Sequence, residues 1–169
     1  QTLDAAFLLG PLADPRTKSL PLSTYPLSVV ARADSELARC PAPVGIAELR
    51  ARPVITYPRN TRPYMNVRDA LAVPGEPAPR IYANASLSTI VRMALDGIGA
   101  AVIPAVLVER EIAAGDLVVV ETQARFQPLT FTATWLAEAG DPTVQAVIAT
   151  ARAVAGEQPF AAEAGGVSG

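Results

Sequence analysis

The stretch Asn84–Pro104, NASLSTIVRMALDGIGAAVIP, decides the fold that we expect for this chain. A β-rich run over 80–83 precedes it, and a Ser/Thr-rich helix start, an apolar-periodic helix and a buried strand over 100–103 follow in order. The helix is expected to end at Gly97 and Gly99, because glycine is common where helices stop. The apolar side chains that helical spacing places on one face are Ile90, Val91, Ala94, Leu95 and Ile98. The stretch is therefore predicted to form one strand–helix–strand unit with a polar mouth.

The polar mouth of this unit has two interpretations. The first backbone N–H groups of a helix lack intrahelical partners, so together with nearby hydroxyl groups they form a candidate site for an anion or a small polar ligand. Plain helix capping is the alternative, and Ser86 or Ser88 alone satisfies it. The local sequence leaves both interpretations open and favours capping.

Composition excludes several classes of function. Half of the 169 residues are apolar, the formal net charge is −2 and there is no histidine. Such a chain can bury a core, has no basic footprint for binding DNA or RNA by itself, and lacks Ser-His-Asp, Cys-His and histidine-containing metal sites. No pair among the carboxylates, which include Asp96, Glu109, Glu111 and Asp116, has a spacing that requires acid–base catalysis. We therefore expect no enzyme, no metal and no cofactor.

The chain is predicted to be a soluble, cytoplasmic protein. No apolar run approaches the roughly 20 residues that cross a bilayer, and the first residues lack a signal-peptide pattern. Cys40 is the single cysteine, so an internal disulfide is impossible and a reducing compartment is compatible.

Strands and helices alternate through the middle of the chain. From Val54 onward the predicted strands are 54–57, 80–83, 100–103 and 117–120, and the helices between them lie at about 64–71, within 84–99 and at 105–114. This alternation predicts an α/β fold with a parallel or mostly parallel sheet.

The two ends of the chain give further elements. A buried strand is expected over 3–9, and one or two strands over 20–32, broken at Pro21 and Pro26. After a connector at 33–43 and a short helix at 46–51, the last elements are a strand at 129–136 and a helix from Asp141 to about Val154. The residues expected on the packed face of that last helix are Val144, Val147, Ile148 and Ala151.

Several weak motifs occur in an order that is more specific than any one of them. These are Leu3-Asp4-Ala5-Ala6-Phe7, the run 27–38, Glu48-Leu49 followed by Pro53-Val54-Ile55, MALDGIGAAVIP over 93–104, and Gly115-Asp116-Leu117-Val118. Over about 3–155 the chain resembles the effector-binding domain of LysR-type transcriptional regulators, although the usual His-Pro of the run 27–38 is replaced here. The resemblance implies a fold like type II periplasmic binding proteins, with two subdomains, mostly parallel sheets and a ligand cleft.

The resemblance also implies how the chain is divided. Residues 1–32 are expected to belong to subdomain I, 33–128 to subdomain II and 129–156 to a segment that returns to subdomain I, followed by a flexible tail at 157–169. The family further implies an N-terminal winged helix-turn-helix, a linker helix and a first strand–helix–strand of subdomain I. None of these precedes Gln1, so we expect a fragment whose first subdomain is incomplete.

Matched to the family, the cleft lies at the strand-to-helix junctions. The implied ligand-binding residues are Tyr57, Arg59, Asn60 and Thr61 after one strand, Asn84 and Ser86 after the next, Pro104 nearby, and Gly10 on the opposite wall. A guanidinium offers a bidentate match to a carboxylate, so Arg59 is the candidate partner of an anionic ligand, with a solvated surface arginine as the alternative. Tyr57 is expected to pack rather than bind.

The leading hypothesis is an effector-sensing domain of a bacterial transcription regulator. A small anionic metabolite is expected to bind between the subdomains and to change DNA binding by the full-length protein, as a homodimer or homotetramer. DNA would be contacted only through the helix-turn-helix, and no membrane partner is expected. The alternative is an extracytoplasmic solute-binding protein of the same fold.

Overall fold

The computed structural model describes residues 4–10, 14–137 and 142–157. They form two compact units. Unit 1 combines the residues up to Tyr25 with those from Leu129 onward, and unit 2 is Pro26–Pro128. The predicted α/β fold class is confirmed, because unit 2 combines a sheet with several helices and unit 1 combines a sheet with helix α5.

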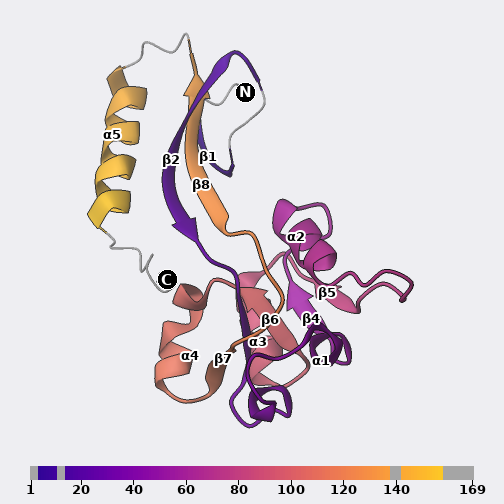
Figure 1. The fold of residues 1–169 in the computed structure, drawn as a ribbon. Helices are drawn as coiled ribbons and strands as arrows, with labels where there is room; N and C mark the ends of the chain where they lie inside the picture. The colour runs from indigo at the N-terminus through magenta and orange to yellow at the C-terminus, as the bar shows by residue number, and fades with distance from the viewer. Residues whose placement is uncertain (1–3, 11–13, 138–141, 158–169) are drawn as a thin grey trace, which may run out of the picture. The chain divides into compact units, whose positions relative to one another are not determined.

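Unit 2 contains a five-stranded sheet in the order β5-β4-β6-β3-β7 (Figure 1). Its strands are β3 (Ser28–Arg32), β4 (Val54–Thr56), β5 (Ile81–Ala83), β6 (Ala100–Ile103) and β7 (Leu117–Val120). β4 pairs in parallel with β5 and β6, whereas β3 is antiparallel to both β6 and β7. Four strands therefore run in one direction, and β3 runs against them.

Because of the position of β3, the observed boundary between the first two segments of the chain lies earlier than the predicted one. Residues 26–32, assigned to subdomain I from the sequence, belong to unit 2 because β3 is hydrogen-bonded between β6 and β7. The second transition lies at Pro128–Leu129. Of the predicted tail, Glu157 is the last residue of α5, and 158–169 lie outside the described residues.

The helices of unit 2 are α1 (Ile46–Arg50), α2 (Arg62–Ala70), α3 (Leu87–Leu95) and α4 (Glu109–Ala113), with 3-10 turns at Leu37–Arg39 and Ala105–Val108. The connections from β4 to β5 and from β5 to β6 cross the sheet in opposite directions. Right-handed connections then place α2 and α3 on opposite faces. Covered on both faces, β4 and β6 are buried at every position.

Helix α3 forms the core predicted for it, with one exception. Its Ile90 and Ala94 are fully buried among Ile55, Ile103 and other side chains of the sheet. Ile98 was predicted on the same face, but it is 45% exposed. The helix has ended by then in a Schellman motif, in which Gly97 has φ +71° and the Ile98 N–H donates to Met93 O at 3.0 Å.

Gly99 was predicted as a residue that ends the helix, but it has a different role. A Cβ atom at this position would lie 2.2 Å from the carbonyl oxygen of Pro53. The glycine is therefore needed because the backbone of the next chain segment passes so close, and its backbone does not adopt a positive φ.

The helix predicted over 105–114 is in fact two short pieces. The 3-10 turn Ala105–Val108 precedes α4, and Val108 separates them with φ −134° and ψ 26°. Val108 is fully buried, while its apolar neighbours Val106 and Leu107 are 47% and 44% exposed. The chain departs from one continuous helix at the residue that enters the core.

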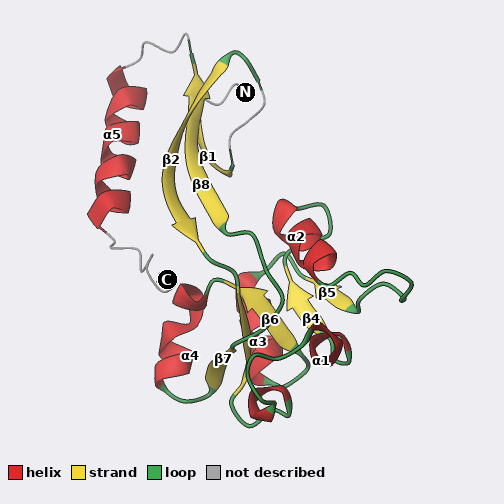
Figure 2. Ribbon diagram, viewed as in Figure 1, coloured by secondary structure: helices red, strands yellow, loops and turns green. Residues whose placement is uncertain are grey.

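Unit 1 is built on an antiparallel sheet in the order β1-β8-β2 (Figure 2). Its elements are β1 (Ala5–Leu9), β2 (Thr17–Tyr25), β8 (Leu129–Leu136) and α5 (Pro142–Glu157). Helix α5 contacts β2 and β8 through Val144 and Ile148, whereas Val147, predicted on the same face, is 44% exposed. The mostly parallel arrangement that was expected thus applies to unit 2 only.

Two strand predictions in unit 1 were wrong for the same reason. β1 was expected to be buried, but it is an edge strand and Phe7 on it is 55% exposed. Pro21 was expected to interrupt the strand, yet β2 continues through it with a register shift between Pro21 and Ser23. β2 is also an edge strand, where a residue without a backbone N–H is tolerated.

Candidate functional site

The candidate site lies at the edge of the unit 2 sheet where β4, β5 and β6 end. Thr56 at the end of β4 pairs with Ala83 at the end of β5, and the N–H of Asn84 donates to the Thr56 carbonyl at 3.0 Å. Tyr57, Asn84 and Pro104 are each the first residue after one of these strands. In α/β sheets, ligands bind at the carboxyl ends of the strands.

The start of α3 carries a compact set of hydroxyl and amide groups. Asn84 Oδ1 accepts a hydrogen bond from the Ser86 N–H at 2.8 Å, and Ser86 Oγ accepts one from the Thr89 N–H at 3.4 Å. Ser86 is thus the N-cap residue, and its Oγ lies 2.8 Å from that of Ser88. The capping interpretation is correct, and Ser86 remains exposed, so capping does not prevent contact with a ligand.

The start of α2 lies after the neighbouring strand. Thr61 caps this helix, because its Oγ1 accepts from the Tyr64 N–H at 3.5 Å and donates to Pro58 O at 2.7 Å. Arg59 and Asn60 precede it in an exposed loop. Within the described part of the chain, neither side chain makes a hydrogen bond or an ion pair. The Arg59 guanidinium is therefore available at this edge.

Tyr57 packs, as expected from the sequence. Its ring is half-buried and lies against the cluster that contains Ile55 and Ile103. Burial raises the pKa of the Tyr57 phenol above its ordinary value of 10.0. The hydroxyl is protonated at neutral pH, as an ordinary tyrosine is, and can donate a hydrogen bond.

Two predicted residues contribute backbone rather than side-chain chemistry. Pro104 is buried at the start of the 3-10 turn that follows β6. Gly10 lies in unit 1, where φ is +74°, its N–H donates to Thr130 O at 2.8 Å and its carbonyl accepts from Thr132 Oγ1 at 2.8 Å. The structure thus gathers the other predicted residues along one edge of unit 2 and describes Gly10 within unit 1 alone.

Sequence reasoning missed a groove that borders this edge. Its cavity of about 630 Å³ is lined by Asn60, Thr61, Arg62, Met65, Asn66, Asp69, Ala70, Arg125 and Gln127. Arg125 and Gln127 follow β7 and are about 60 residues from α2 in sequence, so no local pattern connects them with it. In the described residues, no group of three or more Cys, Asp or Glu side chains could hold a metal ion.

The fold and this edge define the chain as an α/β ligand-binding domain of the periplasmic-binding-protein type. The family model described as the LysR substrate binding domain matches residues 1–156. The chain belongs to this family, and the resemblance inferred from its motifs is confirmed. None of the helices in the described segments is long and apolar enough to cross a membrane.

Solved structures of regulatory domains share this fold. The CcmR regulatory domain of Synechocystis PCC6803, in complex with 2-PG, is similar with TM-score 0.74 and 19% identity over 90% of this chain and 73% of that one. The MetR regulatory domain of N. meningitidis is similar with TM-score 0.71 and 17% identity over 91% of this chain and 70% of that one. The bromide-bound HypT regulatory domain of Salmonella typhimurium is similar with TM-score 0.71 and 18% identity over 92% of this chain and 73% of that one. No curated protein sequence matches the chain.

Proposed function

We propose that this domain binds a small anionic metabolite and thereby controls a LysR-type transcriptional regulator of which it is the sensing part. DNA contact is assigned to a helix-turn-helix outside this sequence, and the regulator to the cytoplasm as a homodimer or homotetramer. The family match favours this function over that of an extracytoplasmic solute-binding protein. It also favours a binding domain over an enzyme, and substrate turnover by the chain would overturn that part of the proposal.

One observation supports the proposal that the ligand is anionic. The N-termini of α2 and α3, capped by Thr61 and Ser86, both begin at the edge where the parallel strands end, and Arg59 lies in the loop beside them. Each helix start presents N–H groups and a partial positive charge, and a guanidinium adds a full charge. These contributions have the same sign, so the edge favours a carboxylate, phosphate or halide.

The named side chains have distinct roles in this proposal. Arg59 pairs with the anion, Asn60, Asn84 and Ser86 supply hydrogen bonds, and the protonated Tyr57 hydroxyl is a further donor. Thr61 and Pro104 shape the edge through their backbone turns. Gly10 lies in unit 1 and remains a prediction of the family resemblance.

Two of the similar structures support this choice of ligand. The HypT regulatory domain binds a bromide ion and the CcmR regulatory domain binds 2-PG. These two ligands define the first compounds to test.

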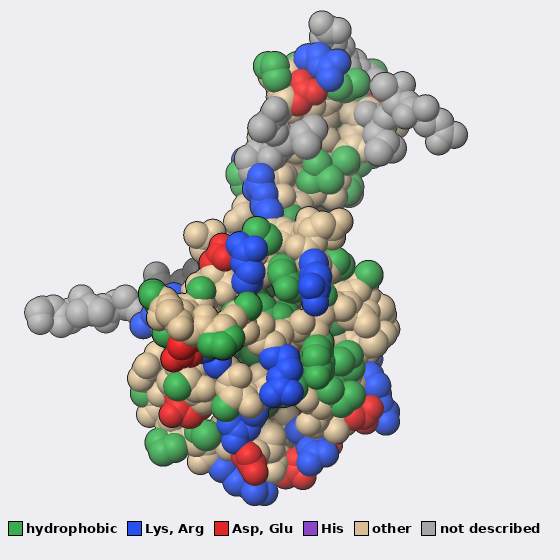
Figure 3. All heavy atoms as spheres, turned by 90° about the vertical axis from the view of Figure 1, so that its right-hand side faces the viewer, with side chains coloured by type: hydrophobic (Ala, Val, Ile, Leu, Met, Phe, Trp, Pro, Cys, Tyr) green, Lys and Arg blue, Asp and Glu red, His purple; other side chains and the backbone are tan. Residues whose placement is uncertain are grey.

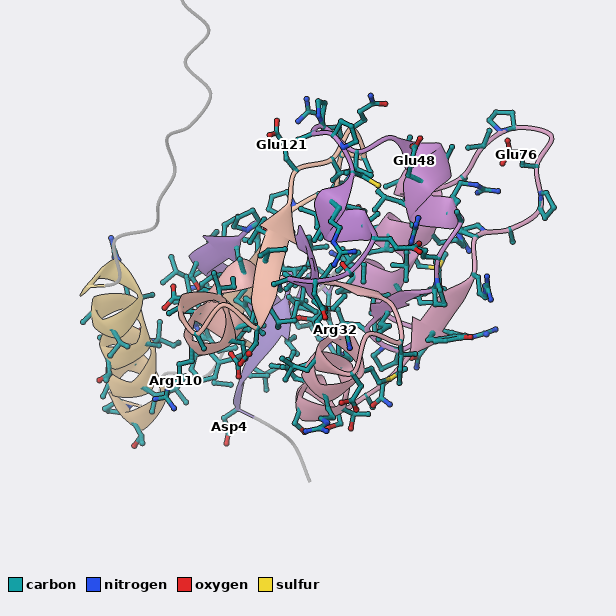
Figure 4. The ribbon with its side chains drawn as sticks, turned by 90° about the horizontal axis from the view of Figure 1, so that it is seen from below. Asp4, Arg32, Glu48, Glu76, Arg110 and Glu121 are labelled. Atoms are coloured by element: carbon teal, nitrogen blue, oxygen red, sulfur yellow. The ribbon has the colours of Figure 1, made fainter. Side chains whose placement is uncertain are left out.

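The experiment is calorimetry of this chain with 2-PG, bromide, succinate and benzoate. We expect at least one of these anions to bind, and Arg59→Ala to weaken it by about 10-fold or more, because a hydrogen bond to a charged group contributes roughly 1.5–3 kcal/mol. Arg110→Ala is the matched control, since Arg110 is also exposed but lies on α4 (Figure 4). Absence of binding by the whole panel, or equal weakening by the two variants, would contradict the proposal.

A further inference from the structure

The groove along α2 has two walls that are fastened together. One wall is α2, and the other is the segment 125–127, which approaches the crossing at Pro128. The Asn66 side chain donates from Nδ2 to Gln127 O at 2.7 Å and accepts the Gln127 N–H on Oδ1 at 3.0 Å. This pair of hydrogen bonds fixes the separation of the walls, so the groove exists before any ligand enters and less ordering entropy is lost on binding.

Charge in the groove is unbalanced. Arg62 and Arg125 line it, are exposed, and make no hydrogen bond or ion pair with any residue that the structure describes. The carboxylate of the groove, Asp69, is already paired with Arg68 at 2.7 Å. The lining therefore carries two guanidinium groups and one carboxylate, and of these three groups only the carboxylate has an ion-pair partner.

These two arginines differ from others in the same structure. Ion pairs hold Arg16, Arg32, Arg50, Arg52, Arg68 and Arg92. Figure 3 views the face that carries α2 and β5, where Lys and Arg side chains are interspersed with acidic ones. Other arginines of the described residues, such as Arg59, Arg80 and Arg110, also make no ion pair, so what sets Arg62 and Arg125 apart is that both line one groove.

The groove also offers an apolar contact. Met65 lines it and is 40% exposed, although it is a large hydrophobic side chain. A volume of about 630 Å³ falls in the ordinary range of small-molecule sites. A cation on each wall and the Met65 thioether on the α2 wall suit a ligand with an anionic group and a small apolar body.

We propose that the groove between α2 and residues 125–127 is a second binding site, which takes a small organic anion on Arg62 and Arg125. It goes beyond the proposed effector edge, because neither arginine belongs to that edge and Arg59 does not line the groove. Asn60 and Thr61 border both sites. Asn66 is a positioning residue that holds the two walls at the spacing the ligand needs.

The test is an NMR titration of the isotope-labelled chain with benzoate, which carries one carboxylate and an apolar ring. The signals followed are the Asn66 side-chain amide and the Gln127 backbone amide, since both belong to the fastening of the walls. We expect saturable shifts of both signals. Benzamide, which has the same ring without the charge, is expected to produce none.

Two double variants separate a site from general charge attraction. Arg62→Gln with Arg125→Gln is expected to weaken benzoate binding by about 10-fold or more, since each lost guanidinium removes a charge-assisted hydrogen bond. Arg80→Gln with Arg110→Gln is the matched control, because both arginines are exposed and neither side chain has a partner among the described residues. The control is expected to bind within about twofold of the parent chain.

Several results would overturn the inference. They are the absence of saturable shifts, equal shifts with benzamide, unchanged binding in the Arg62/Arg125 variant, or equal weakening in the control. Loss of the same shifts in Arg59→Ala would place the ligand at the strand-end edge and would also overturn it. If calorimetry shows no effector at the edge but these shifts persist and depend on Arg62 and Arg125, the binding site in the groove is supported and the proposed function at the edge is not.

Discussion

The two units bury their sheets to different extents. In unit 2, β4 and β6 are buried at every position, whereas in unit 1 neither β1 nor β2 contains a fully buried residue. The largest fully buried side chains among the described residues, which include Leu49, Ile55 and Ile103, all lie in unit 2. A sheet covered on two faces thus contrasts with an antiparallel sheet that packs one helix.

This contrast explains where the candidate edge is built. The edge stands on strands fixed by core packing from both sides, so the caps at Thr61 and Ser86 are held by rigid elements. Unit 1 relies more on side-chain hydrogen bonds between strands, such as Ser19 with Thr134 at 2.8 Å and Thr24 with Thr130 at 3.1 Å. We therefore expect unit 2 to dominate the stability of the described chain.

The largest effect is expected from truncating the core of unit 2. Ile55 is fully buried and Ile148 on α5 is 7% exposed. Ile55→Ala should lower the free energy of unfolding by an amount near the top of the roughly 2–5 kcal/mol range, and Ile148→Ala by one near the bottom. Urea unfolding measures both values, and an equal or larger loss for Ile148→Ala would break the contrast.

Two glycine substitutions should act in opposite directions. Gly99→Ala in unit 2 forces a methyl group onto the Pro53 carbonyl and should cost about 1–3 kcal/mol. Gly156→Ala in unit 1 meets no atom within 4 Å and lies in α5, so it should stabilise by up to about 1 kcal/mol. Thermal unfolding of the two variants gives the signs. A neutral Gly99→Ala would show that the backbone there adjusts easily.

Substitutions at two serines compare how much an interstrand hydrogen bond of unit 1 and a helix cap of unit 2 contribute to stability. Ser19→Ala leaves the buried Thr134 hydroxyl without its partner and should cost about 1–2 kcal/mol. Ser86→Ala removes an exposed N-cap and should cost about 1 kcal/mol or less, while Ser86→Gly should cost only a few tenths. Urea unfolding midpoints rank the three variants, and a larger cost for Ser86→Ala than for Ser19→Ala would contradict the order.

The smallest effects are expected at the extremes of pH. In unit 2, burial raises the Tyr57 pKa, so its contribution is complete below pH 10.0 and is lost as pH rises through the higher folded value. In unit 1, the Arg16 side chain lowers the Asp14 pKa from 3.8 to about 2, so its contribution is present above pH 3.8 and is lost as pH falls through about 2. Tyr57→Phe should remove the alkaline loss and Asp14→Asn the acidic one. Stability curves against pH that match the parent chain would contradict these assignments.

Local patterns predicted much of the fold and part of the site. The helix start at Ser86 and the strand 100–103 were correct, because caps and periodicity depend on residues within a few positions of one another. Ile98 was assigned to the wrong face because periodicity continues past the point where a Schellman motif ends the helix. Pro21 was misjudged because its tolerance depends on β2 being an edge strand.

The long loop after α2 is held in place by contacts that no local sequence pattern predicts. Arg50 is 10% exposed, donates to Leu71 O at 2.7 Å and Pro77 O at 2.6 Å, and pairs with Glu76 at 3.0 Å. Its sequence neighbourhood indicates only the last turn of a short helix. The loop is held by a side chain that lies more than 20 residues earlier in the chain.

By itself, the sequence determined the alternation of strands and helices, the capped helix start within Asn84–Pro104, the absence of histidine chemistry and the family. These properties follow from composition, from hydrogen bonds between near neighbours and from the order of motifs. Only the tertiary structure decided that β3 joins unit 2, that Gly99 accommodates Pro53, and that Arg62 and Arg125 line one groove. Each depends on segments distant in sequence, whose approach is set by sheet pairing and core packing.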